Sequence, residues 1–69
     1  MAPQDQVTIG GANYLISGFP TKQVVAWKLI FRGGEQLSKG DFMALPVLDR
    51  EMLLHAVVDH IDKVNKAGR

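Results

Sequence analysis

Two short runs of alternating apolar and polar residues begin the chain and predict a β-hairpin. Val7 to Ile9 are β-branched and Tyr14 to Ile16 are strand-prone. Gly10 and Gly11 lie between the runs and fit a two-residue turn that needs positive φ. This turn places Ile9 opposite Ala12 and Val7 opposite Tyr14, so that alternate residues share a face. The apolar face would carry Val7, Ile9, Ala12, Tyr14 and Ile16, and the other face Thr8, Asn13 and Ser17, with Leu15 as the exception.

The pattern that follows the hairpin predicts an α-helix over residues 21–32. Thr21 can cap its first turn, and the pair Gly33-Gly34 is typical of a helix end. Seven of the eight residues from 24 to 31 are apolar, so the polar face of this helix would be unusually narrow. One apolar row can pack on the hairpin. We expect the remaining apolar surface to be covered by another protein chain, and the alternative is that all of it belongs to the core of the domain.

Two further helices are predicted in the second half of the chain. In the first, Ser38 followed by Asp41 resembles a capping box, and Pro46 would end that short helix. Asp49 is a suitable N-cap for a long helix that runs toward the C-terminus. Its apolar stripe is Leu53, Leu54, Val57, Val58, Ile61 and Val64. Its polar side is Arg50, Glu51, His55, Asp59, Asp62, Lys63 and Lys66.

These elements predict the fold class and the domain organisation. The expected fold is α+β, with an N-terminal β-hairpin packed against about three α-helices. Residues 1–69 should form a single small interaction domain. A chain of this length buries a modest fraction of its surface, and it contains no cysteine for disulfides, so a partner chain would stabilise it.

Composition and charge narrow the function further. Eight Lys and Arg residues against seven Asp and Glu give a net charge of +1. This balance does not provide the concentrated basic surface with which a protein binds the phosphates of nucleic acid. No apolar run reaches the roughly 20 residues of a membrane span. The first residues, MAPQDQ, lack the basic and apolar regions of a signal peptide. We therefore expect no nucleic acid or membrane partner, and a location in the cytoplasm.

The one cluster of titratable residues does not predict a metal or catalytic site. It consists of His55, Asp59, His60 and Asp62. His55 and Asp59 share a helix face, but His60 projects about 100° away from Asp59. A metal site needs at least three ligands, and nothing else in the sequence supplies the third. We expect a non-enzymatic protein with no catalytic residue, no metal and no cofactor.

A helix-turn-helix DNA-binding regulator is the alternative function. The predicted helix before Gly33-Gly34 and the short helix after it could form such a motif. The second helix would then have to read bases with the sequence SKGDFMAL. That sequence offers one Lys, one Asp and several apolar groups, which suit base edges poorly.

The sequence VTIGGANYLISGFPTKQVVAWKLI resembles the start of small phage tail assembly chaperones. That family commonly opens with a short β-hairpin, then a step of Leu-Pro or Phe-Pro with a polar residue, then an apolar helix. Phe19, Pro20 and Thr21 stand at this step. The later stretch LSKGDFMALPVLDREMLLHAVVDHI resembles the family's short and long helices joined at an acidic cap, here Asp49.

The resemblance implies a protein that acts by binding other phage proteins. Such chaperones bind the long, helical tape measure protein and help tail tube subunits assemble around it. Many members also carry an added C-terminal domain, for which these 69 residues leave no place. We expect either a minimal chaperone, or a prophage-encoded relative that binds a tail chaperone or tape measure protein and blocks assembly. A relative of the second kind would serve as an anti-phage defence.

The expected interface centres on the predicted helix over residues 21–32. Aromatic and Met side chains are favoured at the centres of interfaces. The central residues would be Val24, Trp27, Phe31, Phe42 and Met43. Lys28 and Arg32 would lie at the rim, and a homo-oligomer is expected.

Overall fold

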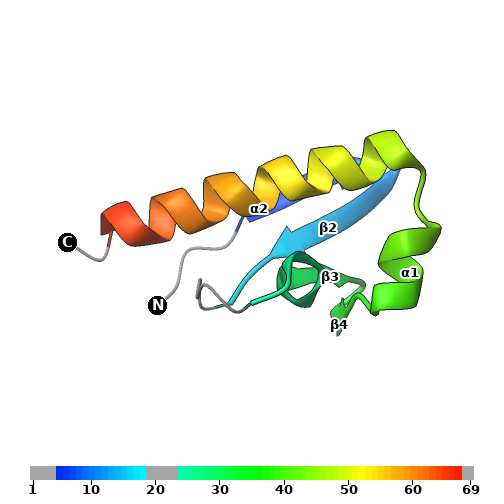
Figure 1. The fold of residues 1–69 in the computed structure, drawn as a ribbon, viewed down its shortest axis with the longest axis horizontal. Coiled ribbons are helices and arrows are strands. Elements are labelled where there is room, and N and C mark those ends of the chain that lie inside the picture. Colours follow the sequence, from blue (N-terminus) through cyan, green and yellow to red (C-terminus); the bar gives the residue numbers. More distant parts are fainter. Residues whose placement is uncertain (1–4, 19–23, 68–69) are drawn as a thin grey trace.

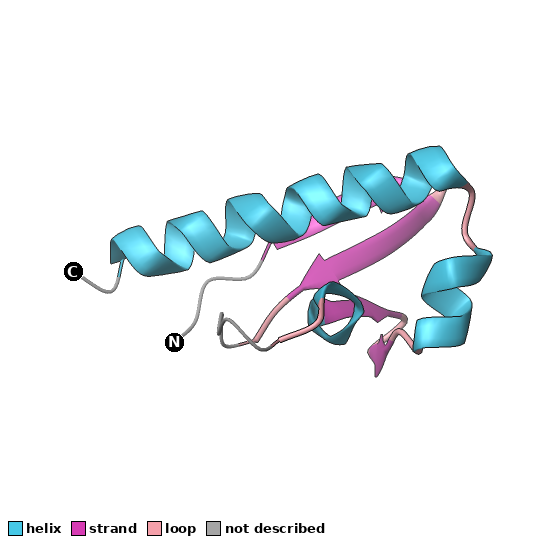
Figure 2. Cartoon of the chain, viewed as in Figure 1, coloured by secondary structure: helices cyan, strands magenta, loops and turns pink. Residues whose placement is uncertain are grey.

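The computed structural model describes residues 5–18 and 24–67, and these form a four-stranded antiparallel sheet with one long helix. The strands are β1 (Asp5–Ile9), β2 (Ala12–Ile16), β3 (Ile30–Arg32) and β4 (Glu35–Gln36). A 3-10 helix, η1 (Ala26–Leu29), precedes β3, and the helices α1 (Lys39–Ala44) and α2 (Val47–Ala67) follow the sheet. Figures 1 and 2 show α2 lying along β1 and β2, with α1 at the end of the sheet where α2 begins.

The predicted hairpin is confirmed, including its register. Ile9 pairs with Ala12 and Val7 pairs with Tyr14 in the β1–β2 ladder. The turn residues Gly10 and Gly11 have φ values of 60° and 82°, as a tight hairpin turn with positive φ at both positions requires. The apolar face of the hairpin points toward α2. The exposed face is fixed in part by a 2.7 Å hydrogen bond between the Thr8 hydroxyl and the Asn13 side-chain oxygen.

The predicted α-helix over residues 21–32 is wrong for the part of it that the structure describes. Residues 26–29 form one 3-10 turn and Ile30 to Arg32 form a strand. Strand β3 pairs with the free edge of β2, placing Ile16 opposite Ile30 and Leu15 opposite Phe31. This pairing satisfies backbone groups that a two-stranded hairpin would leave open, and Ile and Phe suit a pleated strand. The expected helix cap, Thr21, lies outside the described residues.

The fold class of a hairpin against about three helices must therefore be corrected. Gly33 and Gly34 do not end a helix; they have φ values of 64° and 85° and turn β3 into β4. The sheet has the order β1-β2-β3-β4, and all its pairs are antiparallel. Among the described residues, α2 is the one long helix. The chain is still α+β, but the sheet contains twice the expected number of strands.

The short helix is confirmed, and the long helix begins two residues before its predicted cap. The Ser38 hydroxyl accepts a hydrogen bond from the Asp41 backbone N–H at 3.1 Å, which caps α1. In α2, the Pro46 carbonyl accepts the first helical bond from the Arg50 N–H at 3.0 Å. Asp49 lies within the first turn of α2, where its negative charge complements the helix dipole.

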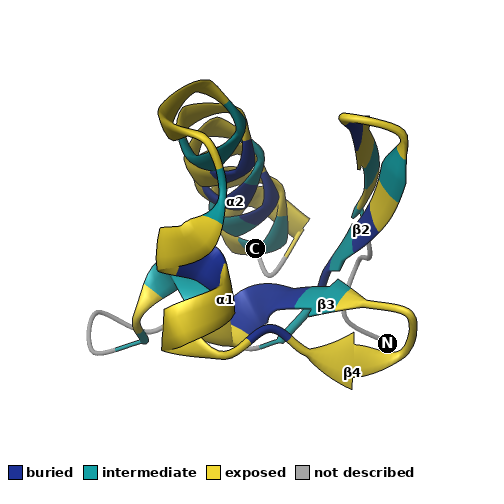
Figure 3. Ribbon diagram, turned by 90° about the vertical axis from the view of Figure 1, so that its right-hand side faces the viewer, coloured by how far each residue is buried: buried dark blue, intermediate teal, exposed yellow. Residues whose placement is uncertain are grey.

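The hydrophobic core lies between the concave side of the sheet and one side of α2. Figure 3 shows the buried residues of α2 facing the strands and its exposed residues facing away. Leu53 and Val57 are the buried apolar residues of α2, and α1 contributes Phe42 to the core. In the described part of the chain, the buried apolar set is Ile9, Tyr14, Ile16, Leu29, Ile30, Leu37, Phe42, Leu53 and Val57.

The alternation of burial along β3 gives a direct test of this fold. Ile30 is fully buried in the core, whereas the next residue, Phe31, is half-buried on the opposite side of the sheet. We expect Ile30→Ala to lower the free energy of unfolding by about 2–5 kcal/mol, because it leaves a cavity in the core. Phe31→Ala should cost less. Urea denaturation followed by circular dichroism would compare the two variants, and a larger loss for Phe31→Ala would contradict the strand.

Candidate functional site

The residues expected at the interface occupy different parts of the fold. Trp27 lies in η1 and Phe31 in β3, so the predicted helical row of Val24, Trp27 and Phe31 does not exist. Val24 and Trp27 are half-buried and pack against the core. Phe42 is 7% exposed and belongs to the core itself.

Three of the expected interface residues do reach the surface. Lys28 and Arg32 are exposed, and Met43 is 54% exposed at the end of α1. The Met43 sulfur lies 3.7 Å from a guanidinium nitrogen of Arg50. A neighbouring cation–π contact places the Lys39 ammonium 5.9 Å from the centre of the Trp27 ring. Met43 therefore lies beside the first turns of α2.

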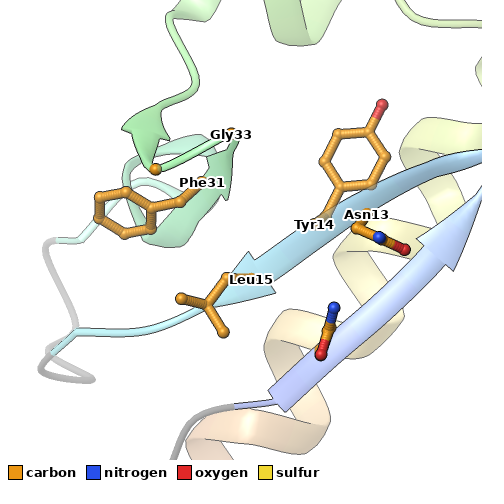
Figure 4. A pocket seen from close by; sticks show the side chains of 7 residues that line it. Asn13, Tyr14, Leu15, Phe31 and Gly33 are labelled. Carbon is orange, nitrogen blue, oxygen red and sulfur yellow. The ribbon is translucent and has the colours of Figure 1, made fainter.

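Phe31 contributes to a shallow depression on the side of the sheet that α2 does not cover. Leu15 and Phe31 are paired across β2 and β3, and Gln6 is paired with Leu15 across β1 and β2. Figure 4 shows the Leu15 and Phe31 side chains together and the Tyr14 ring directed away from them. Polar side chains surround this apolar pair, including Gln6 and Asn13. The apolar part of this surface is therefore small.

The largest group of exposed apolar side chains lies on α2, on the side that faces away from the sheet. We call this group the α2 outer face, and it consists of Val47, Leu48, Met52, Leu54 and Val58. Leu48 is 72% exposed and Val58 is 63% exposed. Large apolar side chains are normally scattered singly over a protein surface, whereas contiguous ones mark interaction sites. The α2 outer face is thus the candidate functional site.

Helical spacing divides the α2 outer face into two rows. Val47, Glu51, Leu54 and Val58 follow one another at intervals of four, three and four residues, and we call this row the α2 seam. Intervals of three and four are the spacing by which one helix packs along another in a coiled coil. Leu48 and Met52 form a second, shorter row beside it. A second shallow depression runs over the seam between Glu51, Leu54, His55 and Val58.

The sequence pattern assigned two of these residues to the wrong side of the helix. Leu54 and Val58 belong to the predicted apolar stripe, but the structure leaves Leu54 39% exposed and Val58 63% exposed. His60, assigned to no apolar face, is fully buried in their place. The seven-residue interval from Val47 to Leu54, and the four-residue interval to Val58, could have indicated a second apolar side.

The buried His60 lies at the junction of α2 with β1. Its Nδ1 atom is 3.5 Å from one carboxylate oxygen of Asp5, which is long for a hydrogen bond. The other Asp5 oxygen lies 3.2 Å from the ammonium of Lys63. Asp5 therefore joins the start of the sheet to two successive turns of α2. This contact is a structural link between the elements rather than a cleft open to a substrate.

The cluster of titratable residues on α2 is split between the two sides of the helix. His55, Asp59 and Asp62 are exposed, whereas His60 is buried. Within residues 5–18 and 24–67, no group of three or more His, Asp or Glu side chains lies close enough to hold a metal ion. No helix in that part of the chain has the length and apolar character needed to cross a bilayer.

Comparisons with known proteins supply no family for this chain. It matches no protein-family model, no curated protein and no solved structure.

Adjacent valines on α2 offer a stability test of the two sides of the helix. Val57 is 4% exposed in the core, while Val58 belongs to the α2 seam. We expect Val58→Lys to change the free energy of unfolding by no more than about 0.5 kcal/mol, as is usual for surface substitutions. Val57→Lys should abolish folding, because it buries an unpaired charge. Circular dichroism and urea denaturation would measure both, and an unfolded Val58→Lys protein would contradict the assignment.

Proposed function

We propose that this protein is a non-enzymatic interaction domain that binds another protein through the α2 outer face. The observation that carries the proposal is the set of five large apolar side chains exposed on one side of a single helix. Leaving such a surface in water is unfavourable, and covering it with a partner recovers the hydrophobic free energy. The sheet provides a rigid support for the helix that presents this surface.

The spacing of the α2 seam indicates the kind of partner that would fit. A straight helix with apolar residues at intervals of three and four binds best to another helix with the same intervals. Such a partner helix would lie in the shallow depression over the seam and contact Leu54 and Val58. Leu48 and Met52 could enlarge the contact on one flank, where the flexible Met side chain adapts to different partner shapes.

The resemblance to phage tail assembly chaperones suggests where such a partner would be found. The tape measure proteins bound by that family are long and helical, which agrees with the seam. The apolar helix expected after the Phe19-Pro20 step is absent from the described residues, so this part of the resemblance loses its structural basis. The hairpin and the short and long helices remain.

The proposed partner is therefore a tape measure protein or a tail assembly chaperone, met in the cytoplasm of the bacterial host. Binding could assist tail assembly. A prophage-encoded copy could instead occupy the tail proteins of an incoming phage and block assembly. The helix-turn-helix alternative relied on the helix before Gly33, which is a 3-10 turn and a strand, and no other observation favours it.

A charge placed in the α2 seam should weaken partner binding without unfolding the domain. We expect Val58→Lys to reduce affinity for a purified tape measure protein or tail chaperone by about tenfold or more, because the Lys side chain would be desolvated at the apolar contact. Val25→Lys is the matched control, since Val25 is also exposed but precedes η1. Isothermal titration calorimetry would give both affinities.

Whether binding assists or blocks tail assembly needs a separate measurement. Cells that express the protein would be infected with a tailed phage, and tailed and tailless particles would be counted by electron microscopy. An assembly protein should raise the tailed fraction and an inhibitor should lower it, with Val58→Lys losing either effect. No change in tail formation, together with no binding to either tail protein, would refute the proposal.

A further inference from the structure

The α2 seam has a sequence that can pair with itself. Its four positions combine three apolar residues with one acid, and His55 lies one turn after Glu51 on the same exposed side. We propose that a second copy of the chain occupies the seam, with the two α2 helices side by side and antiparallel. The partner surface described above would then be covered by the protein itself until a different partner arrives.

The antiparallel arrangement matches apolar residues with apolar residues at both ends of the seam. When Val47 of one copy faces Val58 of the second copy, the two-fold symmetry also places Val58 of the first copy against Val47 of the second. Between these two ends, Leu54 of each copy faces Glu51 of the other copy. The contact from residue 47 to residue 58 would extend over roughly 17 Å of helix, at about 1.5 Å per residue.

Charge decides between the antiparallel and the parallel orientation. In a parallel pair each Glu51 would face Glu51 of the second copy, and two like charges at the centre of the contact would repel one another. In the antiparallel pair each Glu51 carboxylate instead lies beside His55 of the second copy, which can donate a hydrogen bond to it. Two such contacts form, one on each side of the symmetry axis.

The uncovered side of the sheet does not have this self-complementarity. There, the apolar pair Leu15 and Phe31 is half-buried and is flanked by Gln6 and Asn13. Its described residues carry no acid beside a basic or imidazole group that could fix an orientation. The α2 seam is exposed, has helical spacing, and carries a hydrogen-bond acceptor, Glu51, beside a donor, His55. It is therefore the surface assigned to the second copy.

Self-pairing would regulate access to the seam if the same surface binds tail proteins, a consequence that rests on the proposed function. Two copies would have to separate before a partner helix could lie against Leu54 and Val58. Partner affinity would then fall as the concentration of the protein rises, because the dimer competes for the surface. The pairing itself does not depend on that function.

Analytical ultracentrifugation of four forms of the purified chain tests the proposal. The unmodified protein should sediment as a dimer with twice the chain mass, in equilibrium with monomer. Val58→Lys should shift it to monomer. The double variant Val47→Glu with Val58→Lys should restore the dimer, because only the antiparallel pair brings each new Glu against the new Lys of the second copy. Val25→Lys, at an exposed residue outside α2, is the control and should leave the dimer unchanged.

Several outcomes would overturn the proposal. A monomer at every concentration of the unmodified protein would exclude self-pairing, and so would a dimer that Val58→Lys does not dissociate. Failure of the double variant to restore the dimer would exclude the antiparallel register. If the protein is monomeric but still binds a tail protein through Val58, self-pairing fails and the proposed function stands. A dimer that binds no tail protein would support self-pairing and count against the proposed function.

Discussion

The packing of one side of α2 against the concave side of the sheet is the contact on which the rest of the structure depends. A β-hairpin alone has too little buried surface to be stable, and α2 is the one long helix in the described chain that can cover it. Leu53 and Val57 are buried in the core on the side of α2 that faces the sheet, while Asp5 links β1 to His60 and Lys63 near the other end of the helix. Because the described residues form one sheet and one long helix, the sheet and α2 each have a covered side and an uncovered side.

The uncovered side of α2 follows directly from the way in which the segment before Gly33 folds. As a helix, that segment would have provided a second cylinder for α2 to pack against. It is instead a 3-10 turn and strand β3, whose backbone pairs with β2. The sheet gains two strands, but no other element of residues 5–18 and 24–67 covers the row from Val47 to Val58. The apolar residues of segment 24–31 mostly pack within the domain, and the exposed apolar surface lies on α2 instead.

The aromatic residues expected at an interface mostly pack inside the domain, and aliphatic residues form the exposed apolar surface. Trp27 and Phe42 carry most of the aromatic surface expected at an interface, and both are used largely for packing. The side chains left exposed are aliphatic residues and Met on α2, which suit the long, shallow contact between two helices. The polar residues Glu51 and His55 lie within that surface. In the proposed pair they favour the antiparallel orientation, because a parallel pair would place the two Glu51 carboxylates against each other.

The sequence by itself determined the elements whose signals are local. The hairpin and its register follow from β-branched residues around Gly10-Gly11, and the start of α1 follows from Ser38, since a turn or a cap depends on neighbouring residues alone. The tertiary structure decided the fate of residues 26–32, because their choice of strand over helix depends on the open edge of β2. It also decided which side of α2 is buried: Leu54 and Val58 have the same apolar character as Leu53 and Val57, and the position of the sheet selects between them.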